Sequence, residues 1–196
     1  IDGREIEMQF CMRGPPLLIT NFYAPHSGRP LQERRQFYHR LGHKCERMNR
    51  GKCHLVIGDS NARFHGRKTD EEDILGPFVF GRGIEFVEQQ EQLRPGDFDT
   101  NRQLLCDVMR KSNMVNMNSH FQKPNHKKVT FKDVGTEEKE PPFTPDRFGE
   151  IDLVIINNRW KNCVKNVESE TKRYFPSDHF PVIADIKVKL TKMWKE

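Results

Sequence analysis

Residues 53–61 read Cys-His-Leu-Val-Ile-Gly-Asp-Ser-Asn, and this stretch decides the fold class. The apolar run before Gly58 is short and carries Val and Ile, which favours a buried strand over a helix. Side chains alternate along an extended chain, so Asp59 and Asn61 are predicted to face the same side. Such a pair can serve as a base and an orienting group for one substrate, or it can simply close a turn after the strand.

The segments around this strand alternate between strand and helix patterns. Residues 4–10 alternate apolar and polar side chains, which predicts a half-buried strand with Ile6, Met8 and Phe10 on one side. The other predicted elements are a strand at 17–23 in a hairpin with the first, a helix at 31–48, a helix after Asn101, and strands at 114–117, 129–132, 151–156 and 180–188. Strands and helices interleave without repeats, so we expect one α/β or α+β domain over residues 1–196.

Composition narrows the class of protein. The chain has 196 residues and a net charge of +5, and its longest aliphatic runs are far shorter than the ~20 residues that cross a bilayer, so a membrane span is excluded. Five cysteines without a Cys-x-x-Cys pair predict reduced thiols and an intracellular protein, with the nucleus as one option. The basic balance suits a polyanionic partner if the charge clusters.

Two further polar groups sit beside apolar runs. Asp178 and His179 precede the strand predicted at 180–188, and neighbours on an extended chain point apart, so each needs its own partner. His179 can bind a phosphate oxygen as an imidazolium, and Asp178 can reach a hard cation. The alternative is an exposed loop with two unrelated titratable groups.

An acid interrupts the apolar run at 151–156. Asp152 is disfavoured inside a strand and costly to bury alone, so it needs a partner, and His179 is a good candidate. Otherwise Asp152 contacts water at the end of the strand. A softer signal is Tyr23 before Ala24 and Pro25, where a phenol can contact a phosphate or can simply pack.

Four motifs, taken in their order along the chain, resemble those of the endonuclease/exonuclease/phosphatase superfamily. They are the Tyr-Ala-Pro turn, the Gly-Asp-x-Asn box, the Ile-Asp strand and the Ser-Asp-His box. The central segments at 75–78, 101–121 and 130–131 look like apurinic-type endonuclease domains of non-LTR retroelements and host proteins derived from them. The resemblance implies an α+β, DNase I-like fold, a two-sheet sandwich flanked by helices in four α-β-β-α layers. It covers nearly the whole chain.

The resemblance also implies roles for single residues. Asp59 would activate the attacking water, and Asn61 would orient water and phosphate. His179, held by Asp152, would bind the scissile phosphate, and Tyr23 would contact a phosphate oxygen. These roles agree with the chemistry of the residues, since phosphodiester cleavage needs charge neutralisation and an aligned oxygen nucleophile.

The implied cofactor is Mg²⁺, with Mn²⁺ as an alternative, and Asp178 would assist the metal. Superfamily members start with strands that carry an Asn and a Glu metal ligand, and nothing in this sequence corresponds to them. His26 stands where Asn is usual, and Phe131 where Trp is frequent. We therefore expect a sandwich that lacks its N-terminal strands, with an edge open to another chain.

The main functional prediction is metal-dependent phosphodiester hydrolysis, as an endonuclease acting on DNA. Three explanations of the missing strands stay open: a shortened chain, a protein completed by a partner chain that supplies the strands, or a catalytically silent relative that serves as an interaction or structural subunit. A phosphatase or phospholipid diesterase of the same superfamily is a third function, because phosphoinositides are anionic too.

Overall fold

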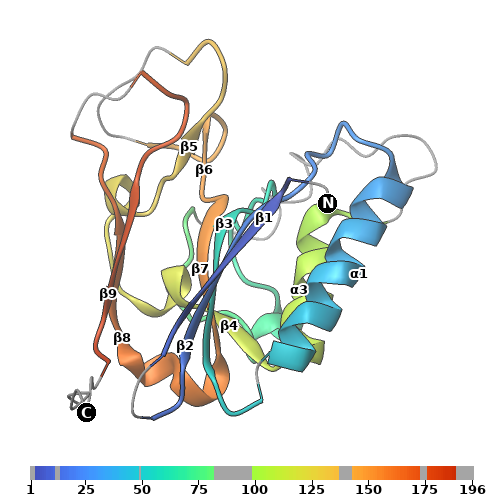
Figure 1. Cartoon of the computed structure of the whole chain (residues 1–196). Coiled ribbons are helices and arrows are strands. Elements are labelled where there is room, and N and C mark those ends of the chain that lie inside the picture. The colour runs from blue at the N-terminus through green and yellow to red at the C-terminus, as the bar shows by residue number, and fades with distance from the viewer. Residues whose placement is uncertain are drawn as a thin grey trace.

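A five-stranded sheet occupies the middle of the computed structural model, with the strand order β1-β2-β3-β7-β4 (Figure 1). The structure describes residues 3–11, 14–48, 50–81, 99–136, 143–172 and 176–188. The five strands are β1 (Glu5–Phe10), β2 (Leu17–Tyr23), β3 (Cys53–Asp59), β4 (Met114–Asn116) and β7 (Asp152–Asn157). Strands β2 and β3 run parallel, and the other neighbours in the sheet run antiparallel. The parallel pair needs a crossover, which a helix supplies.

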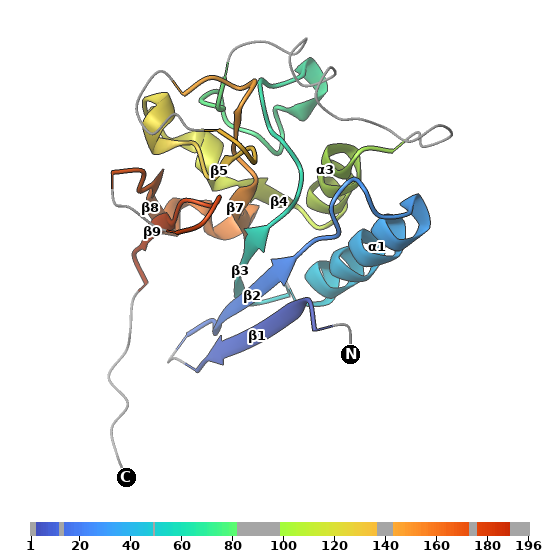
Figure 2. The same ribbon diagram turned by 90° about the horizontal axis from the view of Figure 1, so that it is seen from above.

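Helices α1 (Leu31–Met48) and α3 (Asn101–Lys111) cover one face of this sheet (Figure 2). Helix α1 begins and ends where its pattern predicts, and its apolar stripe, including Phe37 and Leu41, packs into the core against the sheet and α3. Helix α3 is capped by Thr100, whose hydroxyl accepts a hydrogen bond from the Gln103 amide at 3.0 Å. The two helices form an outer layer on this face of the sheet.

A hairpin of β8 (Val164–Ser169) and β9 (Val182–Ile186) packs against the opposite face of the main sheet. Its apolar side chains contact those of β3, β4 and β7 in a second core. The predicted α+β two-sheet sandwich is confirmed. The described α-helices both lie on the outer face of the first sheet (Figure 1).

The ends of the predicted strands shift where proline and pairing partners intervene. The strand predicted at 129–132 is reduced to β5 (Phe131–Lys132), which pairs with β6 (Phe148–Gly149). The last strand starts after Pro181, which has no amide to donate. Short 3-10 turns complete the described fold at Thr69–Glu71, Met117–His120, Asn125–Lys127 and Asn158–Cys163. Among the described residues, no helix combines the length and the apolar character that a membrane crossing requires.

Strand β1 exists as predicted, but the prediction that its apolar side is half-buried is wrong. Three large apolar side chains on this strand are exposed: Ile6 (64%), Met8 (52%) and Phe10 (48%). Met8 pairs with Ile19, whose side chain belongs to the face opposite the helices. The β8–β9 hairpin lies over the other end of that face, and β1 extends beyond it (Figure 2). The polar side of β1 instead faces α1, where Glu5 and Glu7 both pair with Lys44.

Candidate active site

Three neighbouring strands of the main sheet, β2, β3 and β7, place polar residues at their ends on the same side of the sheet. Tyr23 ends β2, Asp59 ends β3 and Asp152 begins β7. The register pairs Tyr23 with Asp59 and Asp59 with Asp152. These three residues therefore stand side by side in the order of the strands, although they are far apart in the sequence.

Asn61, in the turn after β3, donates hydrogen bonds to the carboxylate of Asp59. The Asn61 amide donates a hydrogen bond to Asp59 Oδ1 at 2.7 Å, and Asn61 Nδ2 lies 3.3 Å from Asp59 Oδ2. The two side chains meet, as predicted, but the predicted extended conformation is wrong, because Asn61 has a φ of 46°. Gly58 is required here, since a Cβ on it would lie 1.9 Å from the carbonyl oxygen of Phe22.

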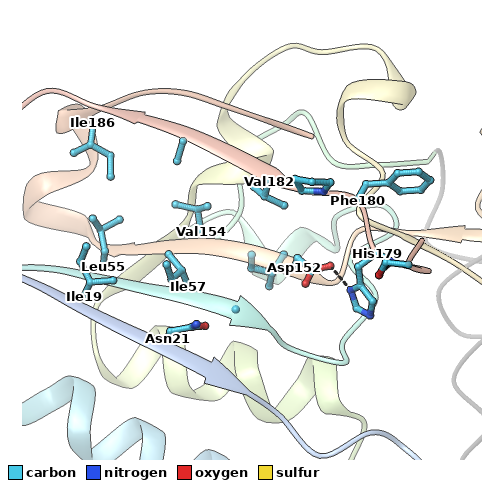
Figure 3. A pocket seen from close by; sticks show the side chains of 15 residues that line it. Ile19, Asn21, Leu55, Ile57, Asp152, Val154, His179, Phe180, Val182 and Ile186 are labelled. Carbon is cyan, nitrogen blue, oxygen red and sulfur yellow. Dashed lines mark hydrogen bonds and ion pairs between the residues drawn. The ribbon is translucent and has the colours of Figure 1, made fainter. Parts of the chain in front are cut away.

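The partner predicted for Asp152 is the one that the structure provides. His179 Nδ1 lies 2.9 Å from Asp152 Oδ2 (Figure 3). The Asp152 amide is held by Thr130 Oγ1 at 3.0 Å, and the backbone of residues 178–180 pairs with that of 130–132. The ring of Phe131 packs against the imidazole, with centroids 5.0 Å apart. The carboxylate and the backbone thus fix the imidazole from two directions.

The environment sets opposite protonation tendencies in this cluster. Burial raises the pKa of Asp59 to about 6, against the lowering effect of the Asn61 amide, and the Asp152 charge raises it further while His179 lowers it. The hydrogen bond to Asp152 raises the pKa of His179, and the charges of Asp59 and Asp178 act in the same direction. At neutral pH Asp59 is mainly ionised, and the imidazolium form of His179 is more stable than that of a free histidine.

The two remaining predicted residues lie at the margin of the cluster. Tyr23 is 51% exposed, and the guanidinium carbon of Arg4 lies 5.6 Å from the centre of its ring. Asp178 is exposed, and its carbonyl oxygen accepts a hydrogen bond from the Lys132 amide. Its charge is close enough to raise the pKa of His179. His26, which stands where the resemblance expects Asn, accepts a hydrogen bond from the Gly28 amide within a turn.

Comparisons with known proteins agree on the architecture. No family model matches the chain. The catalytic domain of APE2 from Xenopus laevis superposes with a TM-score of 0.67 at 18% identity, over 98% of this chain and 58% of that one. The AP endonuclease LMAP from Leishmania major gives a TM-score of 0.65 at 16% identity, over 95% of this chain and 55% of that one. The chain has the AP endonuclease fold.

The same fold occurs in NExo, a 3′-5′ exonuclease from Neisseria meningitidis, with a TM-score of 0.62 at 18% identity, over 94% of this chain and 65% of that one. In sequence, the chain is 27% identical to craniofacial development protein 2 from Tragulus javanicus over 192 residues, which are 96% of this chain and 28% of that protein. The chain therefore spans about a quarter of this curated relative and about three fifths of the solved structures.

An open cleft of about 610 Å³ separates the main sheet from β9 and reaches this cluster (Figure 3). Apolar side chains such as Ile57 and Val182 line most of it, and Asp152 and His179 lie at one end. Asn21, exposed on β2, adds a carboxamide to the wall. The polar cluster is thus continuous with an apolar space between the two sheets.

The described residues do not make up a complete Mg²⁺ site. No group of three or more His, Cys, Asp or Glu side chains that could hold a metal occurs within the described ranges. Asp59 already accepts from Asn61, Asp152 is bound to His179, and Asp178 projects into solvent. Mg²⁺ keeps several waters and takes one or two carboxylates, but it demands near-ideal octahedral geometry.

The sequence pattern missed the residues that support the cluster from within the core. They are Arg34, Tyr38, Ser60, Asn101, Asn118 and Thr130. All six are buried. Ser60 lies inside the Gly-Asp-x-Asn box, and Asn101, Asn118 and Thr130 lie in central segments that carry the resemblance, but no role was assigned to any of them. One signal was available: Arg34 falls on the apolar stripe of α1, three residues before Phe37, where a charged side chain is unexpected.

Proposed function

We propose that this chain carries the catalytic groups of a phosphodiester hydrolase that acts as an endonuclease on DNA. The observation that carries the proposal is the Asp152–His179 pair beside the carboxylate of Asp59 at one strand edge. An ionisable carboxylate and an imidazolium in contact range of one phosphate are what hydrolysis of a phosphodiester requires. We also propose that residues 1–196 form one partial domain.

In the proposed reaction, Asp59 takes a proton from a water molecule, and the oxygen of that water attacks the phosphorus. Asn61 orients the water and the carboxylate. The His179 imidazolium donates a hydrogen bond from Nε2 to a non-bridging phosphate oxygen, because its Nδ1 is directed at Asp152. Tyr23, exposed beside Asp59, contacts a further phosphate oxygen. The bond between phosphorus and the leaving oxygen then breaks, the leaving oxygen takes up a proton from solvent, and Asp59 releases its proton to solvent.

The choice of DNA rests on charge and on the similar proteins. The chain carries a net charge of +5, and solved structures with this fold are named as AP endonucleases and as a 3′-5′ exonuclease. Kinship with retroelement endonucleases and a nuclear location are part of this proposal. A requirement for Mg²⁺ or Mn²⁺, with Asp178 as a ligand, also stays a prediction, since the described donors do not complete a site.

Nicking of a supercoiled plasmid tests the proposal. The natural protein that contains these residues should nick the plasmid with Mg²⁺ or Mn²⁺ and stop when EDTA is added. Asp59→Asn and His179→Ala should each reduce the rate by about 10²- to 10⁴-fold. Competition separates the substrates: excess DNA should inhibit, and excess inositol phosphate should not. Full inhibition by inositol phosphate would favour another phosphodiesterase, and absence of nicking would favour a silent subunit. Wild-type nicking by either variant would refute the roles proposed for Asp59 and His179.

We also propose that additional β-strands from outside these 196 residues extend the second sheet from β9 across the uncovered face. The outer edge of β9 borders the cleft, and neighbouring strands lie about 4.8 Å apart, so strands added there would cover β2 and β1 in turn. The exposed Ile6, Met8 and Phe10 would then be buried. Related chains have room for such strands, because this chain spans only 55% to 65% of the solved structures.

Hydrogen exchange tests the added strands. In the natural protein, the β9 amides that point away from β8 should exchange as slowly as those that pair with β8. In the 196-residue chain alone, only those paired with β8 should be protected. Equal protection in both proteins would refute the added strands. Whether they come from the same polypeptide or from a partner follows from the mass of the purified particle.

A further inference from the structure

We propose that Asn101, held in place by Arg34, is a positioning residue that keeps Asn61 in its left-handed backbone conformation and thereby sets the carboxylate of Asp59. The inference deepens the proposed function and rests on it for the effect on catalysis. Asn101 and Arg34 themselves lie outside the four motif boxes.

Asn101 links the two loops that follow β2 and β3. It is the first residue of α3 and is 2% exposed. Its Nδ2 donates to the carbonyl oxygen of Pro25 at 2.9 Å and to that of Asn61 at 3.0 Å. A single carboxamide therefore ties the loop after Tyr23 to the turn after Asp59, on the side of the sheet where the helices lie.

Arg34 fixes which way the carboxamide points. This α1 side chain is 1% exposed, and its Nη1 lies 3.3 Å from Asn101 Oδ1 and 2.9 Å from the carbonyl oxygen of Asp99. Its Nε donates to the carbonyl oxygen of Arg29 at 3.3 Å. A guanidinium can only donate, so the atom of Asn101 that faces it must be the oxygen. The NH₂ group is thereby directed at the two loop carbonyls.

Asn61 needs such support because its backbone is in a conformation that L-residues avoid. Its φ of 46° costs roughly 1–2 kcal/mol relative to ordinary regions, somewhat less for Asn than for bulkier residues. Three contacts hold it there: Asn101 on its carbonyl, the Ala24 carbonyl on its Nδ2 at 2.8 Å, and Asp59 Oδ1 on its amide at 2.7 Å. Without the first, the turn can relax and withdraw the amide from Asp59.

The protonation of Asp59 reports on that withdrawal. The Asn61 amide lowers the pKa of this carboxyl group, while burial and Asp152 raise it and His179 lowers it. Loss of the amide contact should raise the pKa of Asp59 above its value of about 6. The neighbouring groups Asp152, His179 and Tyr23 stay in place, because Thr130 and the strand register hold them independently.

The experiment compares Asn101→Ala with Asn157→Ala. Asn157 is a matched control, a buried carboxamide that bridges the Lys52 carbonyl and the His54 amide at the opposite end of β3. We expect Asn101→Ala to raise the pKa of Asp59 by about one pH unit in a carboxyl NMR titration, which is the order expected for one hydrogen bond to a charged group. In a nicking assay kcat should fall about ten- to a hundred-fold with little change in KM.

Asn157→Ala should leave the pKa of Asp59 and kcat unchanged at a comparable loss of stability. If Asn101→Ala does not fold, Asn101→Leu serves, because Leu has nearly the size of Asn, adds no charge near Asp59 and removes the donors to Pro25 and Asn61, while Arg34 keeps the carbonyl oxygens of Arg29 and Asp99 as acceptors. An unchanged pKa of Asp59 in the folded Asn101 variant, or an equal shift in Asn157→Ala, would overturn the inference. A wild-type protein without nicking activity would refute the proposed function alone, since the titration needs no substrate.

Discussion

Replacing Asp59 by Asn should make the protein more stable while removing its proposed activity. The carboxyl group is largely buried at the end of β3, and burial raises its pKa from 3.8 to about 6. Asn keeps an oxygen for the Asn61 amide and has no charge to desolvate, and it loses only the long 3.3 Å contact from Asn61 Nδ2. The substitution therefore removes a penalty that the wild-type protein carries only while Asp59 is ionised.

The size of the effect follows from the shift. A difference of roughly two pH units at about 1.36 kcal/mol each gives about 3 kcal/mol as an upper value. Because the folded pKa lies above the unfolded one, the folded protein binds the proton more tightly, and wild-type stability falls as pH rises from about 4 to 6. The gain from Asp59→Asn should be close to zero at pH 4 and should reach up to about 3 kcal/mol at pH 7.

Urea denaturation of both proteins between pH 4 and pH 8 measures this difference. The nicking rate of Asp59→Asn should at the same time fall by about 10²- to 10⁴-fold. A variant that is less stable than wild type at pH 7, or a stability difference that does not depend on pH, would refute the reasoning. Either result would mean that Asp59 is not held in a desolvated environment.

Three further substitutions test the framework of the site and of the core. Asp152→Asn should lower the pKa of His179, because the hydrogen bond to Asp152 raises it, so the alkaline limb of the pH–rate profile should move to lower pH; an unmoved limb would contradict the pairing. Thr130→Val should cost about 2–4 kcal/mol in urea denaturation, since it leaves one buried and one partly buried backbone amide without their acceptor. Arg102→Leu should cost about 3–5 kcal/mol by the same measurement, because it strands the buried carboxylate of Glu71, and a loss below 1 kcal/mol would show that the pair is hydrated.

The elements that the sequence predicted well are those in which local pattern and tertiary burial agree. Helix α1 follows its apolar stripe, and β3 follows its short apolar run up to Asp59. The pairing of Asp152 with His179 was also predictable, because an acid inside an apolar strand requires a partner and only a few boxes in the chain offered one.

Other features depend on neighbours that the local pattern does not contain. The alternation in β1 identifies a strand but not whether a second sheet covers its apolar side, and Met8 is 52% exposed. The turn at Asn61 is left-handed because of contacts to Ala24 and Asn101, which are 37 and 40 residues away. The buried position of Asn101 was not predictable, since an Asn at the start of a helix is usually solvated.

The interior side of helix α1 carries two long polar side chains one turn apart, Arg34 and Tyr38. The Tyr38 hydroxyl donates to the Ser60 carbonyl oxygen at 2.6 Å, while Arg34 reaches Asn101. A leucine-lined helix of equal length would fill the same volume. It would leave the Ser60 carbonyl oxygen and the Asn101 side-chain oxygen buried without these hydrogen-bond donors. Replacing α1 by a generic amphipathic helix should therefore preserve the shape of the fold and loosen the turn at Asn61. Sequence redesign of this protein should treat α1 as part of the candidate active site.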